Sequence, residues 1–515
     1  MNVFGLMARW IPVRNWLLGL LIALGLQGAA AAACGPEDRL TLLHFNDLHG
    51  QLAPLSSADG AHPGGIARLA TLVSEARAER PRQRTLLLFA GDLLQGTLSS
   101  SLFMGRPDLV LLERIGVDAA AVGNHEFDYG QDNFRALARA AGFPFLTANL
   151  GAEPDALPVP SSLLIGGAAE PGVAILGLTT AELLTTTHPR NTKGIQVADP
   201  MEIAGALVPK LRTQADLVVV LSHLGLAADK RLAREVDGID VIIGGHDHAV
   251  LETPVMESGV IILQAGARGQ WLGRLDLNCV AGRLEPSGYR LIPVSTEVAE
   301  DPEIAAEVAR IVAAADAGMD EVIGRIGVDL SAERALIRRD EAIFGDFVAD
   351  LARNITAADI ALFNAGSFRA SIPKGEVTLK QVYEALPFGN ELVVAELEGQ
   401  QLLEALARSA SLHPRDHSGG FLQVSGVRYV IDGNRLASAE LPTGPLDPEA
   451  RYRVVMTDFL AAGGDGYQML MSQAGQVKTG RLVSEVVVAA IRAGAELPLH
   501  SDGRILRRAP TSIGR

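Results

Sequence analysis

The chain has 515 residues, of which 48% are hydrophobic and 20% are charged, a composition that excludes a disordered protein and favours two or three globular domains. Its formal net charge of -15 has the wrong sign for a nucleic-acid-binding protein, so we expect no nucleic-acid partner. An acidic protein that acts on an anion needs metal ions or clustered arginines at its site.

The first 33 residues have the three parts of a signal peptide. Arg9 and Arg14 make a basic start, and an apolar run covers Trp16–Leu26. Small residues at Ala29–Ala33 suit cleavage before Cys34. We therefore expect signal peptide 1–33 and an exported protein, periplasmic or extracellular, with no stable membrane insertion after cleavage. An uncleaved anchor and a lipoprotein anchored at Cys34 are the alternatives.

The chain has only two cysteines, Cys34 and Cys279. Export permits a disulfide between them, and two unpaired thiols are the alternative that the sequence leaves open. Neither cysteine has the spacing of a thiolate metal site.

From residue 40 to about residue 280, short apolar runs alternate with segments of helical periodicity. The runs predict buried strands at Leu40–Phe45, Leu86–Ala90, Ala119–Val122, Val173–Leu178, Leu217–Leu221, Val241–Ile243 and Val260–Leu263. Apolar residues from Ile66 to Ala76 predict one amphipathic helix, and Asn133–Ala141 predicts another. This alternation predicts an α/β fold in which helices cover a sheet core.

The next segments change in character. An Asp-Pro start and one apolar stripe predict a linker helix over residues 301–321. A second domain follows over residues 322–507, with helices at Ile343–Asn354, Gln400–Ser411 and Val483–Ala493.

Five polar motifs follow predicted strands of the first region. They are Asn46-Asp47-Leu48-His49, Gly91-Asp92, Gly123-Asn124-His125-Glu126, Ser222-His223 and Gly244-Gly245-His246-Asp247-His248. A single Asp after a strand is more often a cap or turn residue than a ligand. The D-x-H and H-x-H spacings, however, place both side chains on one side of an extended segment. Carboxylate, amide and imidazole groups without thiolate suit divalent Zn, Mn, Fe or Co.

This series of motifs resembles that of the calcineurin-like metallophosphoesterases over nearly all of residues 38–280, and we assign residues 38–300 to such a domain. The resemblance implies an αββα sandwich that holds two divalent metal ions, Zn, Mn or Co. It assigns Asp47, His49 and His248 to one ion, Asn124, His223 and His246 to the other, and Asp92 to both.

The same resemblance implies the chemistry. Two adjacent dications lower the pKa of a bridging water, and the resulting hydroxide attacks phosphorus. His125, oriented by Asp128, stabilises the transferred phosphoryl group and protonates the leaving alkoxide. Glu126 is expected to have a supporting or structural role.

Three stretches of the second domain combine aromatic, amide and charged side chains: Asn364–Arg369, Leu386–Asn390 and Thr457–Tyr467. They resemble the smaller α+β C-terminal domain of the 5′-nucleotidase family. The resemblance implies a base sandwich between Phe388 and Phe459. It assigns further substrate contacts to Arg338, Asn364, Arg369, Asn390 and Asp465. Phe368 is bulkier than the residue usual in that family.

We therefore expect an exported dimetal phosphohydrolase that removes phosphate from nucleoside 5′-monophosphates, with a nucleotide as its small-molecule partner. The alternatives on the same metals are a 2′,3′-cyclic nucleotide phosphodiesterase/3′-nucleotidase, a UDP-sugar hydrolase and a thiosulfohydrolase. A nucleotide-binding protein without turnover is the non-enzymatic alternative. The sequence leaves the preferred base, the metal in vivo and the oligomeric state open.

Overall fold

The computed structural model describes residues 34–35, 38–55, 62–79, 84–152, 157–167, 170–413, 418–471, 476–498 and 500–508. The expected signal peptide lies outside the described residues. Within the described ranges, no helix is both long and apolar enough to cross a bilayer.

The N-terminal lobe is built on two six-stranded sheets. The first has the order β14 (Arg283–Pro293), β13 (Trp271–Val280), β1 (Arg39–Phe45), β2 (Arg84–Phe89), β3 (Ala119–Ala121) and β4 (Phe145–Leu146). The second has the order β11 (Val255–Glu257), β12 (Val260–Leu263), β10 (Val241–Ile243), β9 (Leu217–His223), β7 (Glu170–Thr179) and β6 (Ser162–Gly167). All seven apolar runs expected to be strands lie in these sheets.

An apolar layer between the two sheets forms the centre of this lobe, with side chains such as Leu42, Leu88, Val219 and Ile243. The outer face of the first sheet packs against α1 (Ile66–Glu79), α3 (Arg106–Ile115) and α4 (Gln131–Ala140). The outer face of the second packs against α6 (Pro200–Arg212) and α7 (Leu226–Glu235). The expected αββα sandwich is therefore confirmed.

Strand direction decides where the polar motifs gather. Strands β1, β2 and β3 are parallel to one another, as are β7, β9 and β10. The carboxyl ends of parallel strands meet at one edge of a sheet. The loops after β1, β2, β3, β9 and β10 therefore meet at one edge of the sandwich.

Helix α8 (Pro302–Asp316) follows the sandwich. The side chain of Asp301 caps it by accepting the backbone N–H groups of Glu303 and Ile304. Its buried stripe, which includes Val308 and Ile311, packs into the core beneath α1. The helix ends before residue 321, because Gly318 has a positive φ of 81° that a right-handed helix does not adopt.

The C-terminal lobe has a five-stranded sheet in the order β19 (Leu422–Ser425), β16 (Ile360–Asn364), β23 (Arg451–Thr457), β18 (Glu391–Glu398) and β24 (Gln476–Leu482). Its main helices are α10 (Ile343–Thr356), α12 (Gly399–Ser411) and α14 (Val483–Arg492), close to the expected ranges. A four-stranded sheet follows the order β22 (Gly444–Pro445), β21 (Arg435–Leu441), β20 (Arg428–Asp432) and β25 (Ile505–Arg508). The expected α+β class is confirmed.

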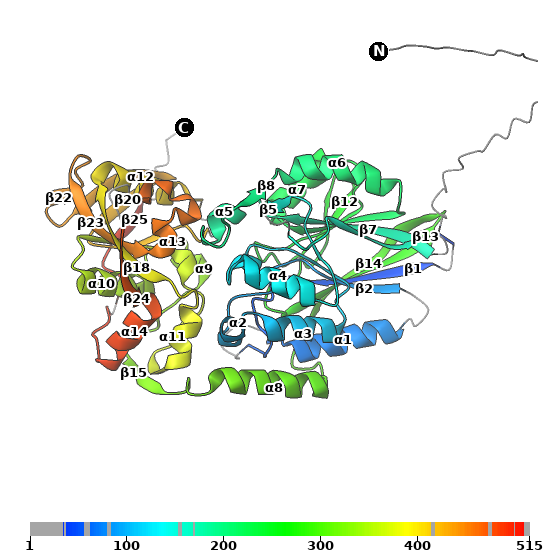
Figure 1. Ribbon diagram of the computed structural model, residues 1–515, viewed down its shortest axis with the longest axis horizontal. Coiled ribbons are helices and arrows are strands. Elements are labelled where there is room, and N and C mark those ends of the chain that lie inside the picture. Colours follow the sequence, from blue (N-terminus) through cyan, green and yellow to red (C-terminus); the bar gives the residue numbers. More distant parts are fainter. Residues whose placement is uncertain are drawn as a thin grey trace, which may run out of the picture.

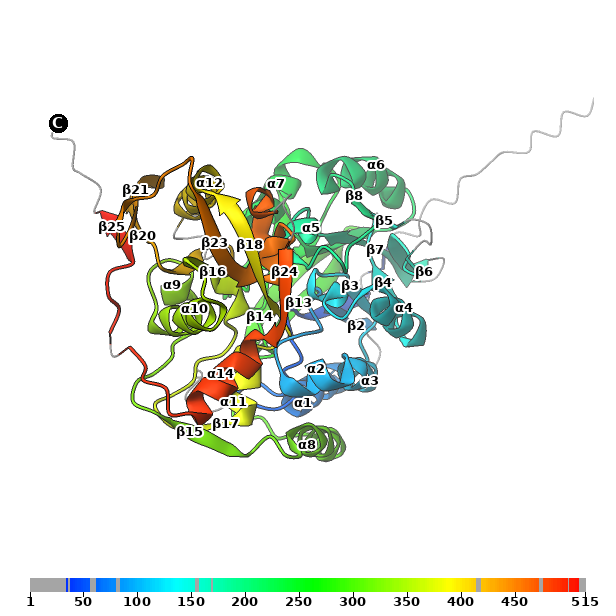
Figure 2. The ribbon, with the colours of Figure 1, turned by 60° about the vertical axis from the view of Figure 1, so that its left-hand side comes forward.

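The two lobes lie side by side, with α8 running along one side of the molecule (Figure 1). They touch where α2 (Leu98–Phe103) meets α11 (Leu379–Ala385) and where α5 (Leu183–Thr186) meets the short helix η4 (Gly464–Gly466). Figure 2 shows α2 beside α11 from a second direction. The motif-bearing edge of the sandwich faces this junction.

Candidate active site

The motif residues occupy tight loops at the strand ends. Five of the seven expected metal ligands have a positive φ: Asp47, His49, Asp92, His246 and His248. Residues other than glycine rarely adopt this conformation, and it persists only where the surroundings hold it in place. Such strain gathered at one edge of a sheet is typical of a functional site.

The first group of ligands comprises Asp47, His49 and His248, whose ligand atoms lie within 4.8 Å of one another. The Nε2 atoms of His49 and His248 are 3.0 Å apart. Nε2 of His248 lies 3.4 Å from Oδ1 of Asp47. The D-x-H segment after β1 and the H-x-H segment after β10 therefore present their donor atoms to a common point.

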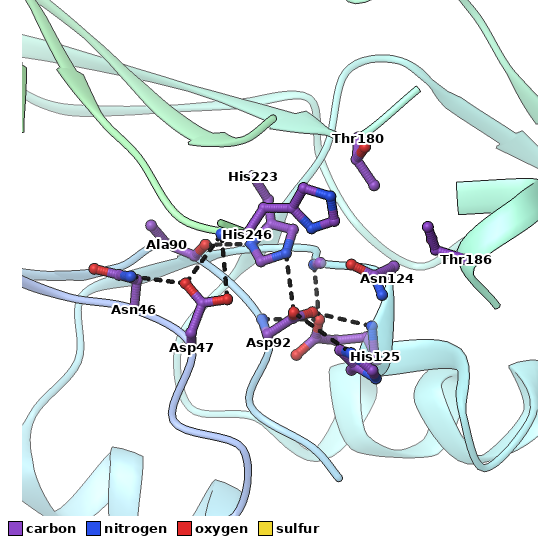
Figure 3. Close-up of polar contacts among 12 residues, drawn as sticks. Asn46, Asp47, Ala90, Asp92, Asn124, His125, Thr180, Thr186, His223 and His246 are labelled. Carbon is purple, nitrogen blue, oxygen red and sulfur yellow. Dashed lines mark hydrogen bonds and ion pairs between the residues drawn. The ribbon is translucent and has the colours of Figure 1, made fainter. Parts of the chain in front are cut away.

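The second group comprises Asp92, His223 and His246, again within 4.8 Å. Nε2 of His223 lies 3.1 Å from Oδ2 of Asp92. The same carboxylate oxygen is 4.0 Å from Nε2 of His49 in the first group. Figure 3 shows Asp47, Asp92, His223 and His246 converging, with Asn124 at the side of the group. Asp92 thus lies between the two groups.

The chemistry of these side chains fits cations. The ring Nδ1 of His49 lies 3.1 Å from the carbonyl oxygen of Gln95, and that of His223 lies 2.7 Å from the carbonyl oxygen of Ala90. Because a carbonyl only accepts, both Nδ1 atoms donate, and each Nε2 carries a lone pair when the ring is neutral. Nε2 of His49 faces Nε2 of His248 at 3.0 Å, and Nε2 of His223 faces a carboxylate oxygen of Asp92 at 3.1 Å. A cation between the atoms of each pair would replace repulsion between lone pairs with attraction.

The pKa values of these side chains reflect burial and the close spacing of their charges. Burial, together with the adjacent Asp92 carboxylate, raises the pKa of Asp47 to about 7. Burial opposes a charge on His223, yet the carboxylates of Asp92 and Asp47 raise its pKa to about 10. Burial lowers the pKa of His246 to about 3, which keeps the ring in the neutral form that ligates metal. The buried Oδ1 of Asn124 has no hydrogen-bond partner in the described part of the chain. These donors fit two divalent ions.

His125 and Asp128 lie beside the ligand groups, on and next to the short helix η1 (His125–Phe127). Nδ1 of His125 contacts Oδ2 of Asp128 at 2.5 Å, and its Nε2 lies 4.0 Å from Oδ2 of Asp92. Burial opposes protonation of the ring, but the charges of Asp128 and Asp92 outweigh it and raise the pKa of His125. These contacts hold the imidazole at the edge of the site and favour its protonated form.

Glu126 joins two of the ligand loops. Its carboxylate accepts the backbone N–H groups of Gly123 at 2.7 Å, Leu93 at 2.7 Å and Asp92 at 3.2 Å. Gly123 leaves the room for this contact, since a Cβ at that position would lie 2.3 Å from Oδ1 of Asp92. By accepting these three N–H groups, Glu126 can support the loops that carry Asp92 and Asn124, as expected from the sequence.

The expected substrate residues of the second lobe fall into two clusters. In the first, the guanidinium of Arg369 lies 5.7 Å from the ring centre of Phe388. That ring lies 6.4 Å from the ring of His125, at an interplanar angle of 26°. Asn390 lines a small cavity next to Phe388. This cluster lies against the catalytic edge of the first lobe.

In the second cluster, Nδ2 of Asn364 donates to Oδ2 of Asp465 at 2.9 Å. Asp465 has a φ of 53°, and burial raises its pKa to about 6. Phe459 lies on α13 (Asp458–Ala461), with its ring 6.3 Å from that of His188. No ring contact joins Phe388 to Phe459 among the residues that the structure describes, so the base sandwich stays a prediction.

Arginines gather where the second lobe faces the metal ligands. Burial, then the neighbouring charges of Arg334 and Arg369, hold the pKa of Arg338 well below its usual value. Burial, then Arg334 and Arg268, lower the pKa of Arg369 to about 10. Arg334 and Arg268 were not expected from the sequence. Arg334 lies one helical turn before Arg338, and this spacing could have indicated that both side chains face the same site. The sequence around Arg268 contains no such signal.

The comparisons with known proteins agree with this geometry. The family model for calcineurin-like phosphoesterases matches residues 40–250, and the model for the 5′-nucleotidase C-terminal domain matches residues 322–472. Snake venom 5′-nucleotidase from Gloydius brevicauda is 30% identical, and the match covers 96% of this chain and 93% of that protein. The chain belongs to the 5′-nucleotidase family.

Two further relatives define how far the likeness extends. The crystal structure of a 5′-nucleotidase precursor from Thermus thermophilus has a TM-score of 0.83 and 34% identity, covering 91% of this chain and 99% of that one. The trifunctional nucleotide phosphoesterase protein YfkN of Bacillus subtilis is 31% identical over 91% of this chain, but the chain spans only 35% of that longer protein. Membership of the family makes this chain a metal-dependent phosphoester hydrolase.

Proposed function

We propose that the protein is an exported 5′-nucleotidase, which removes phosphate from nucleoside 5′-monophosphates with two bound divalent ions. One observation carries the proposal: the ring of Phe388 from the second lobe lies 6.4 Å from the ring of His125 beside the ligand groups. The ring of Phe388 could therefore contact the base of a nucleotide while its phosphate lies beside His125 and the ligand groups.

The proposal divides the work between three segments. Residues 38–300 would hold the metals, residues 301–321 would link the lobes, and residues 322–507 would bind the nucleotide. Asp47, His49 and His248 would hold one ion, and Asn124, His223 and His246 the other, with Asp92 shared between them. Phe388, Phe459, Asn364, Asn390 and Asp465 would contact the nucleoside, and Arg338 and Arg369 the phosphate.

When bound, the two cations would supply an activated water and neutralise charge on the phosphate. The buried guanidinium groups of Arg338 and Arg369 would orient the phosphate without an acid–base role, since arginine stays protonated. Protonated His125, held through Nδ1 by Asp128, would present its Nε2 proton to the leaving 5′-oxygen. A positioned acid of this kind contributes about 10²–10⁴-fold to rate.

One observation favours a second candidate, a substrate with a phosphoanhydride such as a nucleotide sugar. Four arginines act on one another's charge at the same place: Arg268, Arg334, Arg338 and Arg369. A monophosphate carries at most two negative charges, so a second phosphate would use this positive charge more fully. A 2′,3′-cyclic nucleotide has a single charge and gains least from the cluster.

The link between Cys34 and Cys279 supports export. Their Cα atoms are 5.8 Å apart and the two sulfurs are bonded. Disulfides persist in oxidising compartments. A lipid anchor on Cys34 would need the same sulfur, so the disulfide argues against the lipoprotein alternative.

A substrate panel tests the proposal. Purified protein loaded with Mn, Co or Zn is incubated with AMP, UMP, UDP-glucose and 2′,3′-cyclic AMP, and both the inorganic phosphate released and the nucleotide and nucleoside products are measured. We expect release from the monophosphates. Binding of nucleotide without release under any of these metals would favour a nucleotide-binding protein and refute the proposal.

A further inference from the structure

One segment of the metal-binding lobe contacts both Asn124–Asp128, called here the catalytic motif, and the loops that carry Phe388 and Phe459, called here the nucleoside-binding loops. It runs from Thr187 to Asn191, after α5, and is called here the bridging segment. Figure 1 shows α5 at the junction of the two lobes. The sequence alone assigned it no role.

On its own lobe, the bridging segment is fixed to the ends of the catalytic motif. Oγ1 of Thr187 donates to the carbonyl oxygen of Asn124 at 3.0 Å. Nδ2 of Asn191 donates to the carbonyl oxygen of Asp128 at 2.8 Å. These two bonds anchor the bridging segment to the backbone of an expected metal ligand and of the partner of His125.

Across the junction, the bridging segment meets Asp458. Oδ2 of Asp458 lies 3.3 Å from Nε2 of His188 and 3.3 Å from Nη1 of Arg190. The side chain of Asp458 is 6% exposed and that of His188 is 15% exposed, whereas that of Arg190 is 57% exposed. The carboxylate is therefore shielded from solvent, and it meets one shielded side chain and one cation that extends into solvent.

The other oxygen of Asp458 holds the nucleoside-binding loops. Oδ1 accepts the backbone N–H of Phe459 at 3.1 Å and that of Glu391 at 3.2 Å. Glu391 directly follows Asn390, which lies two residues after Phe388. A single carboxylate thus joins both aromatic loops to the segment that holds the catalytic motif.

We propose that His188, Arg190 and Asp458 are positioning residues that align the nucleoside-binding loops with the catalytic motif, so that the 5′-phosphate of a bound nucleotide reaches the metals. The inference rests on the proposed function, because it concerns substrates that bind through their base. A substrate without a base does not use these loops and is insensitive to their alignment.

The substitutions separate this role from a structural one. In Asp458→Asn, Oδ1 can still accept from Phe459 and Glu391, while an NH₂ group replaces the oxygen that faces His188 and Arg190. Arg190→Ala removes the cation, and Arg190→Lys restores the charge. Lys193→Ala is the matched control, since Lys193 is an exposed cation just beyond the same segment.

The measurement is kcat/KM for AMP and for p-nitrophenyl phosphate, which has no base. We expect Asp458→Asn and Arg190→Ala to lower kcat/KM for AMP at least tenfold, to change it less than twofold for p-nitrophenyl phosphate, and to be partly rescued in Arg190→Lys. The double variant should be no worse than Asp458→Asn, because both changes break one contact. Lys193→Ala should match the wild type.

Equal losses on both substrates, no loss on AMP, or independent effects that multiply in the double variant would overturn the inference. Failure of the proposed function is recognised separately, in the wild type: it would hydrolyse p-nitrophenyl phosphate but no nucleotide, and the inference would fall with it.

Discussion

The proposed role of His125 as a proton donor rests on two contacts. Asp128 fixes the ring through Nδ1, and Nε2 is directed toward the ligand groups. His125→Ala should leave metal content unchanged if the two expected ligand sets hold the ions without the ring, although its ligand atom lies within 4.8 Å of those of His49 and Asp92. In that variant kcat should fall about 10²–10⁴-fold. Elemental analysis beside steady-state kinetics checks this. Loss of both metals in the variant would show that His125 is a ligand instead.

Asp108 provides a residue-scale test of pH dependence. Burial raises the pKa of Asp108 from 3.8 to about 7, so the folded state keeps a proton that the unfolded state releases. The free energy of unfolding contributed by this group is fully present below about pH 4 and is lost as the pH rises through 7. The slope is about 1.4 kcal/mol per pH unit at most.

The variant Asp108→Asn cannot ionise and should escape this loss. We expect its Tm to exceed that of the wild type at pH 8 and to approach it at pH 4.5, as measured by scanning calorimetry. Asp132→Asn, an exposed carboxylate on α4, is the control and should give the same Tm difference at both pH values. A Tm difference for Asp108→Asn that does not change with pH would contradict the assignment.

At the scale of elements, the loops after β2 and β3 act as one unit because Glu126 holds both. Glu126→Gln replaces one accepting oxygen with an NH₂ group that faces backbone N–H donors. We expect metal affinity to fall about 10–100-fold, as for other residues that orient ligands. Titration with Mn or Zn measures it, and Glu202→Gln on the exposed face of α6 is the control. An unchanged metal affinity in Glu126→Gln would show that Glu126 does not orient the metal ligands.

The strands and their loops were the part of the fold most open to prediction. Buried parallel strands are continuous apolar runs, so Leu217–Leu221 and Val241–Ile243 could be identified directly. Helix α6 was missed because Pro209 interrupts its pattern. The predicted helix end at residue 321 was too late, since α8 ends at Asp316 and Gly318 has a φ of 81°.

The contacts between lobes could not be predicted. His188 and Asp458 lie 270 residues apart in the chain. The residues around His188 form no sequence pattern that indicates a partner so far away. The same holds for Arg268, whose guanidinium donates to the carbonyl oxygen of Arg369 at 3.2 Å. Such pairs follow from how two finished lobes meet, which no short-range spacing encodes.

At the scale of the whole molecule, the metal site couples several parts of the first lobe. Its expected ligands follow or end β1, β2, β3, β9 and β10, which belong to both sheets of the sandwich. Unfolding separates these strands and destroys the site. Binding of metal to the folded state alone raises the free energy of unfolding by RT ln(1 + [L]/Kd), about 2.7 kcal/mol at a hundredfold excess over Kd.

Chelation should therefore lower the Tm of the first lobe while the second lobe melts as before. The core of the second lobe, with residues such as Phe344, Phe363 and Val455, is separate from that of the sandwich. Calorimetry of metal-loaded and chelator-treated protein checks this, and adding back Mn or Zn should restore the first transition. His223→Ala should lack the metal-dependent shift, because the ring lies within 4.8 Å of its fellow ligands. A shift of equal size in that variant would place the stabilising metal elsewhere.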